Sequence, residues 1–222
     1  MGLSNLFSTP IYMEKVIGNN KESISSELNF LYNSLELKQN VNTFNPLTSH
    51  DVTVDSNGTL FSSNILTGCN KFNTFLHYSV EQYFKSLGFP NFDFIVTESW
   101  FTCTTKGKHA PVHSHGNSDI SGVYYLKTNK KDGNLVLKNP FTFTNGNFIY
   151  FLHNHNNSQQ ELPLEEGLLI LWPSVLEHST YVNETSHDRI SLSFNISISR
   201  YPFTFETSKE QSLNKPIGIL SP

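Results

Sequence analysis

Histidines are unevenly distributed along the 222-residue chain, and three of its nine fall within residues 109–115. Two of these, His113 and His115, are separated by a single residue. Side chains i and i+2 of a β-strand point to the same face and lie about 6.6 Å apart. Two imidazoles at this spacing can therefore bind one metal ion through bonds of about 2.1 Å. The same pattern also occurs in solvated loops, and we expect His153 and His155, which precede a polar stretch, to be such a case.

A further histidine and an arginine follow at strand boundaries later in the chain. The apolar run 167–172 ends at Pro173, and His178 begins the next strand-like segment. Eleven residues later a segment begins in which polar and apolar side chains alternate. Its polar positions share one face of a strand and are Arg189, Ser191, Ser193 and Asn195. A guanidinium beside hydroxyl groups suits the bidentate binding of a carboxylate, although an exposed polar face with an incidental arginine has the same pattern.

Taken in order, these residues resemble the iron(II)- and 2-oxoglutarate-dependent oxygenase superfamily. That superfamily has an early pair of metal ligands separated by one residue, a distal histidine and then an Arg-x-Ser motif. The segments H-x-H-x5-S-G-V-Y-Y-L, G-L-L-I-L-W-P-S-x-L-x-H and R-I-S-x-S-F-N resemble, more narrowly, a family of such oxygenases found in marine bacteria and their viruses. The resemblance extends over nearly the whole chain.

The resemblance implies roles for particular side chains. It gives four catalytic residues: His113, His115, His178 and Arg189. The histidines would hold Fe(II), and Arg189, assisted by Ser191, would bind the distal carboxylate of 2-oxoglutarate. The hydroxyl of Tyr125, or of its neighbour Tyr124, would add a donor, because only one of these two side chains can face the interior of the fold.

The identity of the third metal ligand stays open. The commonest site in the superfamily uses two histidines and one carboxylate, in the order His-x-Asp/Glu and then His. Here the second position of the pair is His115, so the site either has three histidines or takes its carboxylate from Asp119. Four residues of a regular strand span about 13 Å, too far for both to bind one ion, unless residues 116–118 turn the chain. We favour His113, His115 and His178, keep Asp119 in reserve, and leave open that His113 lies outside the ligand set.

The implied activity is that of a dioxygenase. It would use Fe(II), 2-oxoglutarate and O2 to hydroxylate an unidentified substrate, either a small molecule or a peptidyl side chain, and would release succinate and CO2. Two alternatives stay open: a cupin-like three-histidine metalloenzyme that does not use 2-oxoglutarate, and a non-catalytic jelly-roll binding or virion protein. The His-x-His pair favours the metalloenzyme, whereas Arg189 and Ser191 at this distance from His178 disfavour it.

Two helices and a series of strands are expected to position these residues. Apolar side chains recur at helical spacing in 20–38 and 68–87, with a polar connection at 39–65 between them. Short strand-like runs separated by turn residues follow at 92–105, 120–127, 135–138, 148–152, 167–172, 179–182 and 190–199. This order predicts an α+β fold with a jelly-roll core, in which Trp100 and Trp172 pack. The resemblance specifies a cupin-like double-stranded β-helix with the N-terminal helices packed outside.

Length and net charge limit the number of domains and the classes of binding partner. A chain of 25.2 kDa can form a single domain over 1–222, in which we expect a helical support at 1–90, the β-helix core at 91–200 and a C-terminal extension at 201–222. A net charge of −4 argues against nucleic-acid binding and against a polybasic membrane surface. The first residues lack a signal-peptide pattern, so we expect a cytoplasmic enzyme, in the host cytoplasm if a virus encodes it. The sequence leaves a homodimer open.

Overall fold

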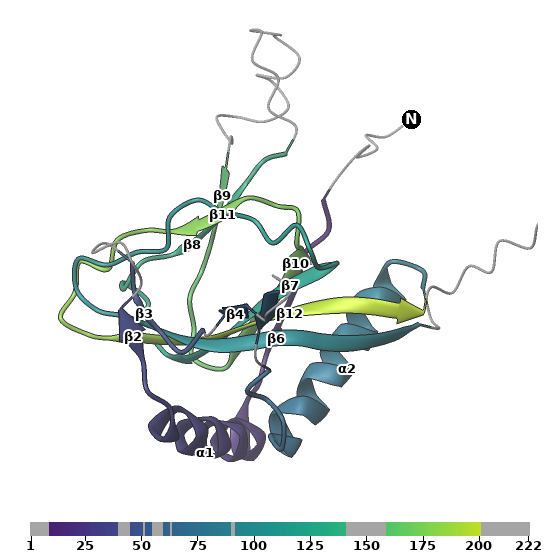
Figure 1. The fold of residues 1–222 in the computed structure, drawn as a ribbon, viewed down its shortest axis with the longest axis horizontal. Coiled ribbons are helices and arrows are strands. Elements are labelled where there is room, and N and C mark those ends of the chain that lie inside the picture. Colours follow the sequence, from purple (N-terminus) through teal and green to yellow (C-terminus); the bar gives the residue numbers. More distant parts are fainter. Residues whose placement is uncertain are drawn as a thin grey trace, which may run out of the picture.

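Antiparallel strands and two helices make up the part of the chain that the computed structural model describes (Figure 1). The described residues are 9–39, 45–50, 52–54, 60–62, 64–89, 92–140 and 159–200. In chain order, the elements are β1 (Tyr12–Lys15), α1 (Gly18–Ser34), β2 (Lys38–Gln39), β3 (Leu47–Thr48), β4 (Val52–Val54), β5 (Leu60–Ser62), α2 (Asn70–Ser86), β6 (Asp93–Thr104), β7 (Ile120–Lys127), β8 (Leu135–Lys138), β9 (Gln159–Leu162), β10 (Leu168–Pro173), β11 (His178–Thr180) and β12 (Arg189–Arg200).

Two sheets form the body of the fold. The larger has seven strands in the order β1-β10-β7-β12-β6-β3-β2, and the smaller has the order β11-β8-β9. Strands β4 and β5 pair with each other in a separate short ribbon. Figure 1 shows the smaller sheet on one side of the larger sheet and both helices on the other. The structure therefore confirms the expected α+β class, with a jelly-roll core and helices packed outside it.

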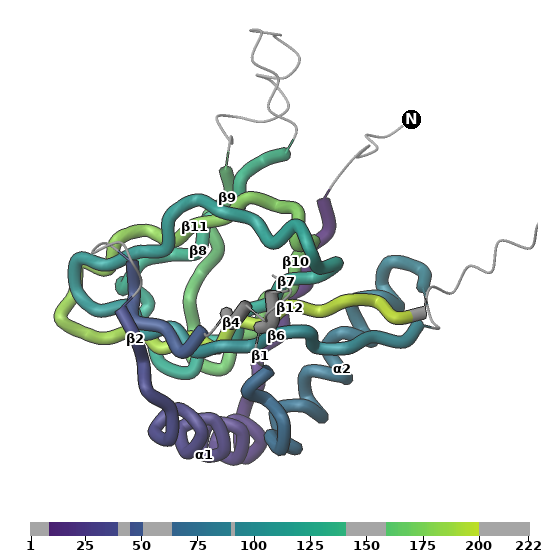
Figure 2. The backbone as a smooth tube through the Cα atoms, in the orientation of Figure 1, coloured from purple at the N-terminus to yellow at the C-terminus, as the bar shows by residue number. Residues whose placement is uncertain are grey.

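β12 lies in the middle of the large sheet, between β6 and β7. The register places Ser193 opposite Trp100 on β6 and opposite Val123 on β7. The backbone trace in Figure 2 shows β12 and β6 running side by side between the helices and the smaller sheet. A strand in this position is covered on both faces, so each of its side chains must suit one of two interiors.

Side-chain alternation on β7 divides the buried residues into two layers. Tyr124 and Leu126 face the helices and pack in the same cluster as Phe72 of α2. Val123 and Tyr125 face the other way and join the cluster that lies between the two sheets. The candidate functional residues of β12 lie on this second side, because the apolar side chains of β12 belong to the helix-facing cluster.

The helices form where the apolar spacing predicts them: α1 begins two residues before the expected 20–38 segment and ends four residues before its end, and α2 lies within the expected 68–87 segment. α1 buries Ile24 and Leu28 against the large sheet, and α2 buries a longer apolar face. α2 ends before Gly88, which has a φ of 85° and is therefore in the left-handed region that glycine adopts readily. The helices of the described part of the chain are not long and apolar enough to cross a membrane.

Three parts of the strand prediction need correction. Residues 159–162 were expected to be loop but form β9, an edge strand that pairs only with β8, so its outward polar side chains stay in solvent. The 39–65 connection, expected to be a polar loop, contains short strands, of which β3 pairs with β6 and β4 with β5. β1, which the sequence did not predict, adds an edge to the large sheet beside β10. The predicted strand at 148–152 lies outside the described residues.

Gly122 of β7 leaves the space that a core aromatic ring fills. It lies opposite Phe194 of β12, and an added Cβ would overlap the Phe194 ring and lie 2.8 Å from Leu171 Cδ2. We expect Gly122→Ala to lower the free energy of unfolding by about 1–3 kcal/mol through overpacking, as measured by urea denaturation. Gly116→Ala is the control, because a Cβ there meets nothing within 4 Å. Equal stability of the Gly122→Ala and parent proteins would contradict this packing.

Candidate metal centre

Backbone hydrogen bonds bring the three candidate histidines together. His178 is the first residue of β11, and the segment that carries His113 and His115 lies beside it. The backbone N–H groups of His113 and His178 each donate to the other residue's carbonyl, at 2.9 and 2.8 Å, and His115 N donates to Ser174 O at 2.9 Å. The pair therefore sits on an extended segment that joins β11 through one isolated bridge, and not on the regular strand that the spacing suggested. Pro111, which has no N–H, precedes the bridge and helps to explain why the ladder is so short.

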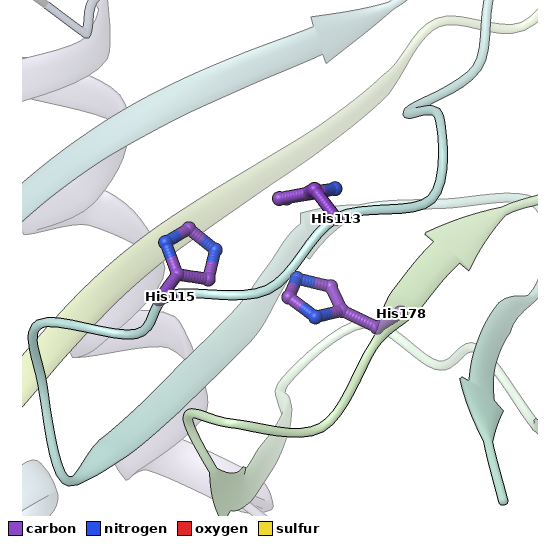
Figure 3. Close-up of side chains that lie close together, drawn as sticks. All are labelled: His113, His115 and His178. Carbon is purple, nitrogen blue, oxygen red and sulfur yellow. The ribbon is translucent and has the colours of Figure 1, made fainter. Parts of the chain in front are cut away.

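The three imidazoles face one another (Figure 3). Their candidate ligand nitrogens all lie within 4.8 Å of one another. Nδ1 of His113 lies 2.7 Å from Pro111 O, and Nδ1 of His178 lies 3.0 Å from Leu176 O. A carbonyl can only accept, so in both rings Nδ1 carries the proton and Nε2 keeps its lone pair. This is the tautomer that a histidine needs to bind a metal ion through Nε2.

Burial keeps two of the rings in the neutral state. Desolvation and, to a smaller extent, the nearby His113 lower the pKa of His178 to about 3. The same two causes, in the same order, lower the pKa of His115 to about 4. At neutral pH both imidazoles are uncharged, and a neutral imidazole is the form that coordinates a metal.

An amide from β12 fixes the third ring. Asn195 Nδ2 lies 3.2 Å from His115 Nδ1, and it also donates to the Glu98 carboxylate. Asn195 Oδ1 accepts a hydrogen bond from Ser121 Oγ at 2.8 Å. The sequence placed Asn195 on the right face but assigned no such role to Glu98. Glu98 is brought in by the strand register, because β6 and β12 pair with Glu98 opposite Asn195.

Asp119, the reserve ligand, contacts the backbone of β12 and does not belong to the histidine group. Its Oδ2 accepts a hydrogen bond from the backbone N–H of Ile198 at 2.7 Å, and its backbone N–H donates to Ile196 O at 2.9 Å. The turn through residues 116–117 is present. The group of potential ligands within 4.8 Å of one another contains His113, His115 and His178 without Asp119.

A cavity of about 400 Å³ adjoins the three histidines. The alternating polar residues of β12 all line it: Arg189, Ser191, Ser193 and Asn195. Tyr125 lines it as well, whereas the ring of Tyr124 packs against Phe72 of α2, with centroids 5.3 Å apart. The prediction that one face of β12 would gather these side chains is confirmed, and of the two tyrosines Tyr125 faces the cavity.

Arg189 is buried at the wall of this cavity, with only 2% of its surface exposed. Its Nη1 donates to the carbonyls of Asp132, at 3.0 Å, and Gly133, and its Nη2 donates to Thr104 Oγ1 at 3.1 Å. Its Nε is buried and has no hydrogen-bond partner among the described residues. Buried donors are almost always satisfied in proteins, so an acceptor that enters the cavity would complete this site. A carboxylate, which can bind Nε and Nη2 together, fits that requirement.

Both tryptophans were expected to pack in the core, but only Trp172 does so. Trp172 is buried between the sheets, and its ring centroid lies 5.0 Å from that of His178. Both tryptophans line the cavity, but Trp100 is only half-buried there; it packs on His50 with centroids 4.5 Å apart and lies 5.7 Å from the ring of His115. The prediction for Trp100 was wrong because its side of β6 faces the cavity.

Comparison with known proteins agrees with this geometry. Residues 98–195 match the family model described as "Putative 2OG-Fe(II) oxygenase". This segment, just under half of the chain, is similar to 2OG-Fe(II) oxygenases. The matched segment begins within β6 and ends within β12 at Asn195. It contains every candidate site residue discussed above except His50. No curated protein matches the chain.

Solved structures share the fold of this chain. A 2OG-Fe(II) oxygenase family oxidoreductase from Burkholderia pseudomallei superposes with a TM-score of 0.56 at 10% identity, over 83% of this chain and 92% of the other. A prolyl-4-hydroxylase from Pseudomonas putida gives 0.53 at 13% identity, over 85% and 93%. HygX from Streptomyces hygroscopicus, with nickel, 2-oxoglutarate and hygromycin B bound, gives 0.51 at 15% identity, over 86% and 84%. Likeness at these identities concerns the fold.

Metal binding should depend on the buried histidine of β11. We expect the protein to bind one Fe(II) per chain, with Mn, Co or Ni as inert substitutes, and His178→Ala to abolish binding because it removes a preorganised Nε2. Anaerobic titration with metal analysis measures this. His77→Ala, at an exposed position of α2, is the control, and His153→Ala and His155→Ala, whose positions lie outside the described residues, should also retain the metal. Full affinity in His178→Ala would contradict the site.

The two ligand sets can be separated with a matched pair of variants. If three histidines bind the metal, His113→Ala loses Fe(II) and Asp119→Asn keeps it. Asparagine retains an oxygen that can accept from Ile198 N, so this substitution tests the carboxylate without removing the backbone contact. The reverse pattern, with iron lost in Asp119→Asn and kept in His113→Ala, would assign the carboxylate as ligand.

Proposed function

We propose that the protein is an Fe(II)- and 2-oxoglutarate-dependent dioxygenase that hydroxylates a small molecule or a peptidyl side chain, with release of succinate and CO2. One observation carries the proposal: buried Arg189, whose Nε has no partner among the described residues, lines the same cavity as the three clustered imidazoles. A metal centre explains the histidines alone. A co-substrate that bears a second, distal carboxylate explains the arginine as well.

The histidines would hold the metal, His113 and His178 through Nε2, the nitrogen whose lone pair is free because Nδ1 donates to a carbonyl. His113, His115 and His178 would occupy three positions around Fe(II) and leave the others for a bidentate 2-oxo acid and for O2. Bound iron supplies the redox chemistry that couples the decarboxylation of 2-oxoglutarate to the hydroxylation of substrate. The carbonyls of Pro111 and Leu176 hold two of the rings in place, and the Asn195 amide holds the third.

The other end of the cavity would bind the distal carboxylate. Arg189 would present Nε and Nη2 to its two oxygens, and Ser191, buried on the same face of β12, would donate its hydroxyl. Burial raises the pKa of Tyr125 to about 12, so its hydroxyl keeps its proton and can donate to the same group. These three side chains would set the orientation of the co-substrate and the distance of its 2-oxo acid end from the metal.

A cupin-like three-histidine metalloenzyme that does not use 2-oxoglutarate is the second candidate. The absence of a carboxylate from the group of His113, His115 and His178 favours it. It gives no reason, however, for a buried guanidinium with an unsatisfied donor in the cavity, because no distal carboxylate would enter there. The two candidates differ in one measurable property, the affinity of the iron-loaded protein for a dicarboxylic 2-oxo acid.

The proposal also covers the organisation of the chain. Residues 1–222 would act as one domain, with 1–90 supporting the outer face of the large sheet, 91–200 carrying the site and 201–222, outside the described residues, as an extension. We propose action in the cytoplasm, on a substrate other than nucleic acid, since the net charge of −4 offers no electrostatic attraction to phosphates.

Arg189 decides between the two candidates. Anaerobic addition of 2-oxoglutarate to the iron-loaded protein should give a metal-to-ligand charge-transfer band. Arg189→Ala should weaken 2-oxoglutarate binding by about a hundredfold, the equivalent of about 2.8 kcal/mol for a lost bidentate charged contact, and should leave iron affinity intact. Arg189→Lys keeps the charge but loses the planar fork, so its loss should be partial, and Ser191→Ala should have a smaller effect in the same direction.

Iron affinity serves as the control for each of these variants, because the metal ligands come from other elements. Succinate release in the presence of Fe(II), 2-oxoglutarate and O2 should follow the same order of variants. The absence of a charge-transfer band in the parent protein, or unchanged 2-oxoglutarate affinity in Arg189→Ala, would move the assignment to the three-histidine metalloenzyme.

A further inference from the structure

The turn between β7 and β8, residues 128–133, is built around a buried carboxylate. Asp132 has 0% of its surface exposed. Its Oδ1 accepts from Thr128 Oγ1 at 2.6 Å, and its Oδ2 accepts from the backbone N–H of Asn129 at 2.9 Å. His187, which precedes β12, places Nδ1 at 3.2 Å from the same Oδ2. The carboxylate therefore closes the turn on itself and ties it to the segment that leads into β12.

The turn presents its backbone to Arg189. The carbonyls of Asp132 and Gly133 both accept from Nη1, so the direction of these two peptide groups fixes one corner of the guanidinium. Gly133 has a φ of 97°, and a Cβ there would overlap Tyr181 O and lie 3.2 Å from Arg189 Nη1. Only glycine allows the backbone to approach this closely, which shows how tightly the turn and the guanidinium are packed.

Asp132 and Arg189 are both buried, yet their charged groups do not form an ion pair among the described residues. The carboxylate contacts the turn, and the guanidinium contacts the carbonyls that the turn supplies. Burial lowers the pKa of Arg189, while the nearby Asp132 charge acts in the opposite direction. Asp132 thus affects Arg189 in two ways, through the geometry of the turn and through its charge, without contact between the two charged groups.

We propose that Asp132 is a positioning residue for the co-substrate: through the 128–133 turn it holds Nη1 of Arg189, so that Nε and Nη2 face the cavity and receive the distal carboxylate. The inference rests on the proposed function and goes beyond it, because Asp132 does not line the cavity and touches neither metal nor co-substrate. Loss of the Asp132 charge lets the turn relax and the guanidinium rotate. Recognition of the distal carboxylate should then weaken, while binding of the 2-oxo acid end at the metal continues.

Two 2-oxo acids separate this role from a general structural one. 2-Oxoglutarate carries a distal carboxylate, and 2-oxobutyrate lacks it but retains the end that binds a metal. In the iron-loaded parent protein we expect 2-oxoglutarate to bind more tightly than 2-oxobutyrate. In Asp132→Asn the affinity for 2-oxoglutarate should fall about tenfold and the affinity for 2-oxobutyrate less than twofold, with iron affinity unchanged; a tenfold loss corresponds to about 1.4 kcal/mol. The charge-transfer band, followed anaerobically, measures all of these affinities.

Two further variants complete the experiment. Thr128→Val removes the hydroxyl that donates to Asp132 and should lower the affinity for 2-oxoglutarate selectively by about threefold, in line with one partly lost hydrogen bond; it also serves if Asp132→Asn does not fold. Glu165→Gln is the matched control. It removes an exposed ion pair to Lys130 on the same turn, away from the buried carboxylate, and should change neither affinity.

The outcomes distinguish the inference from the proposed function. A selective loss of 2-oxoglutarate binding in Asp132→Asn or Thr128→Val supports the positioning role. An equal loss for both 2-oxo acids, or no loss in either variant, overturns that role and leaves the proposed function standing. A parent protein that gives no band with 2-oxoglutarate, or binds the two acids equally, overturns the proposed function itself.

Discussion

Over residues 190–196 β12 is paired on both edges and covered on both faces, so each side chain in this part of the strand must enter one of two interiors. Leu192, Phe194 and Ile196 are fully buried toward the helices. The intervening polar residues, with Arg189 first, line the cavity. A shift of the register by one residue would place the arginine in the apolar layer and a leucine or phenylalanine in the cavity. The Phe194 ring occupies the space left by Gly122, which lies opposite it and has no side chain. The ring therefore fits in one register. The packing of the helix-facing core therefore determines which groups reach the site.

The same constraint places groups of very different charge in one cavity. Desolvation favours neutral imidazoles at His115 and His178, which is what a metal site requires. Arg189 is buried as well, but a guanidinium cannot give up its proton in a protein, so its charge must be compensated by hydrogen bonds. Backbone carbonyls and Thr104 supply three of these and leave Nε unsatisfied. The cavity thus combines uncharged imidazoles with a fixed cation, which suits the proposed dianionic co-substrate held at both ends.

The sequence predicted the parts of this arrangement that depend on periodicity. The two helices, most long strands and the shared face from Arg189 to Asn195 follow from spacing alone, because burial imposes periods of 3.6 and 2. Features that depend on pairing between distant strands could not be predicted in this way. Glu98 reaches Asn195 through the register of β6 and β12, and Trp100 faces the cavity for the same reason. β9 has little apolar patterning, since an edge strand needs only backbone pairing on one side.

Backbone carbonyls orient the proposed functional side chains through atoms that the chemistry does not use. Nδ1 of His113 and of His178 donates to a carbonyl two residues earlier, and Nη1 of Arg189 donates to two carbonyls of the turn before β8. In each case another nitrogen of the side chain, Nε2 of the two imidazoles and Nε of the guanidinium, is left without a hydrogen-bond partner from these carbonyls. Backbone hydrogen bonds hold the segments that carry Pro111 and Leu176, and the buried carboxylate of Asp132 closes the turn that carries the other two carbonyls. Side chains held in this way lose little further freedom when a ligand binds, so more of the contact energy appears as affinity.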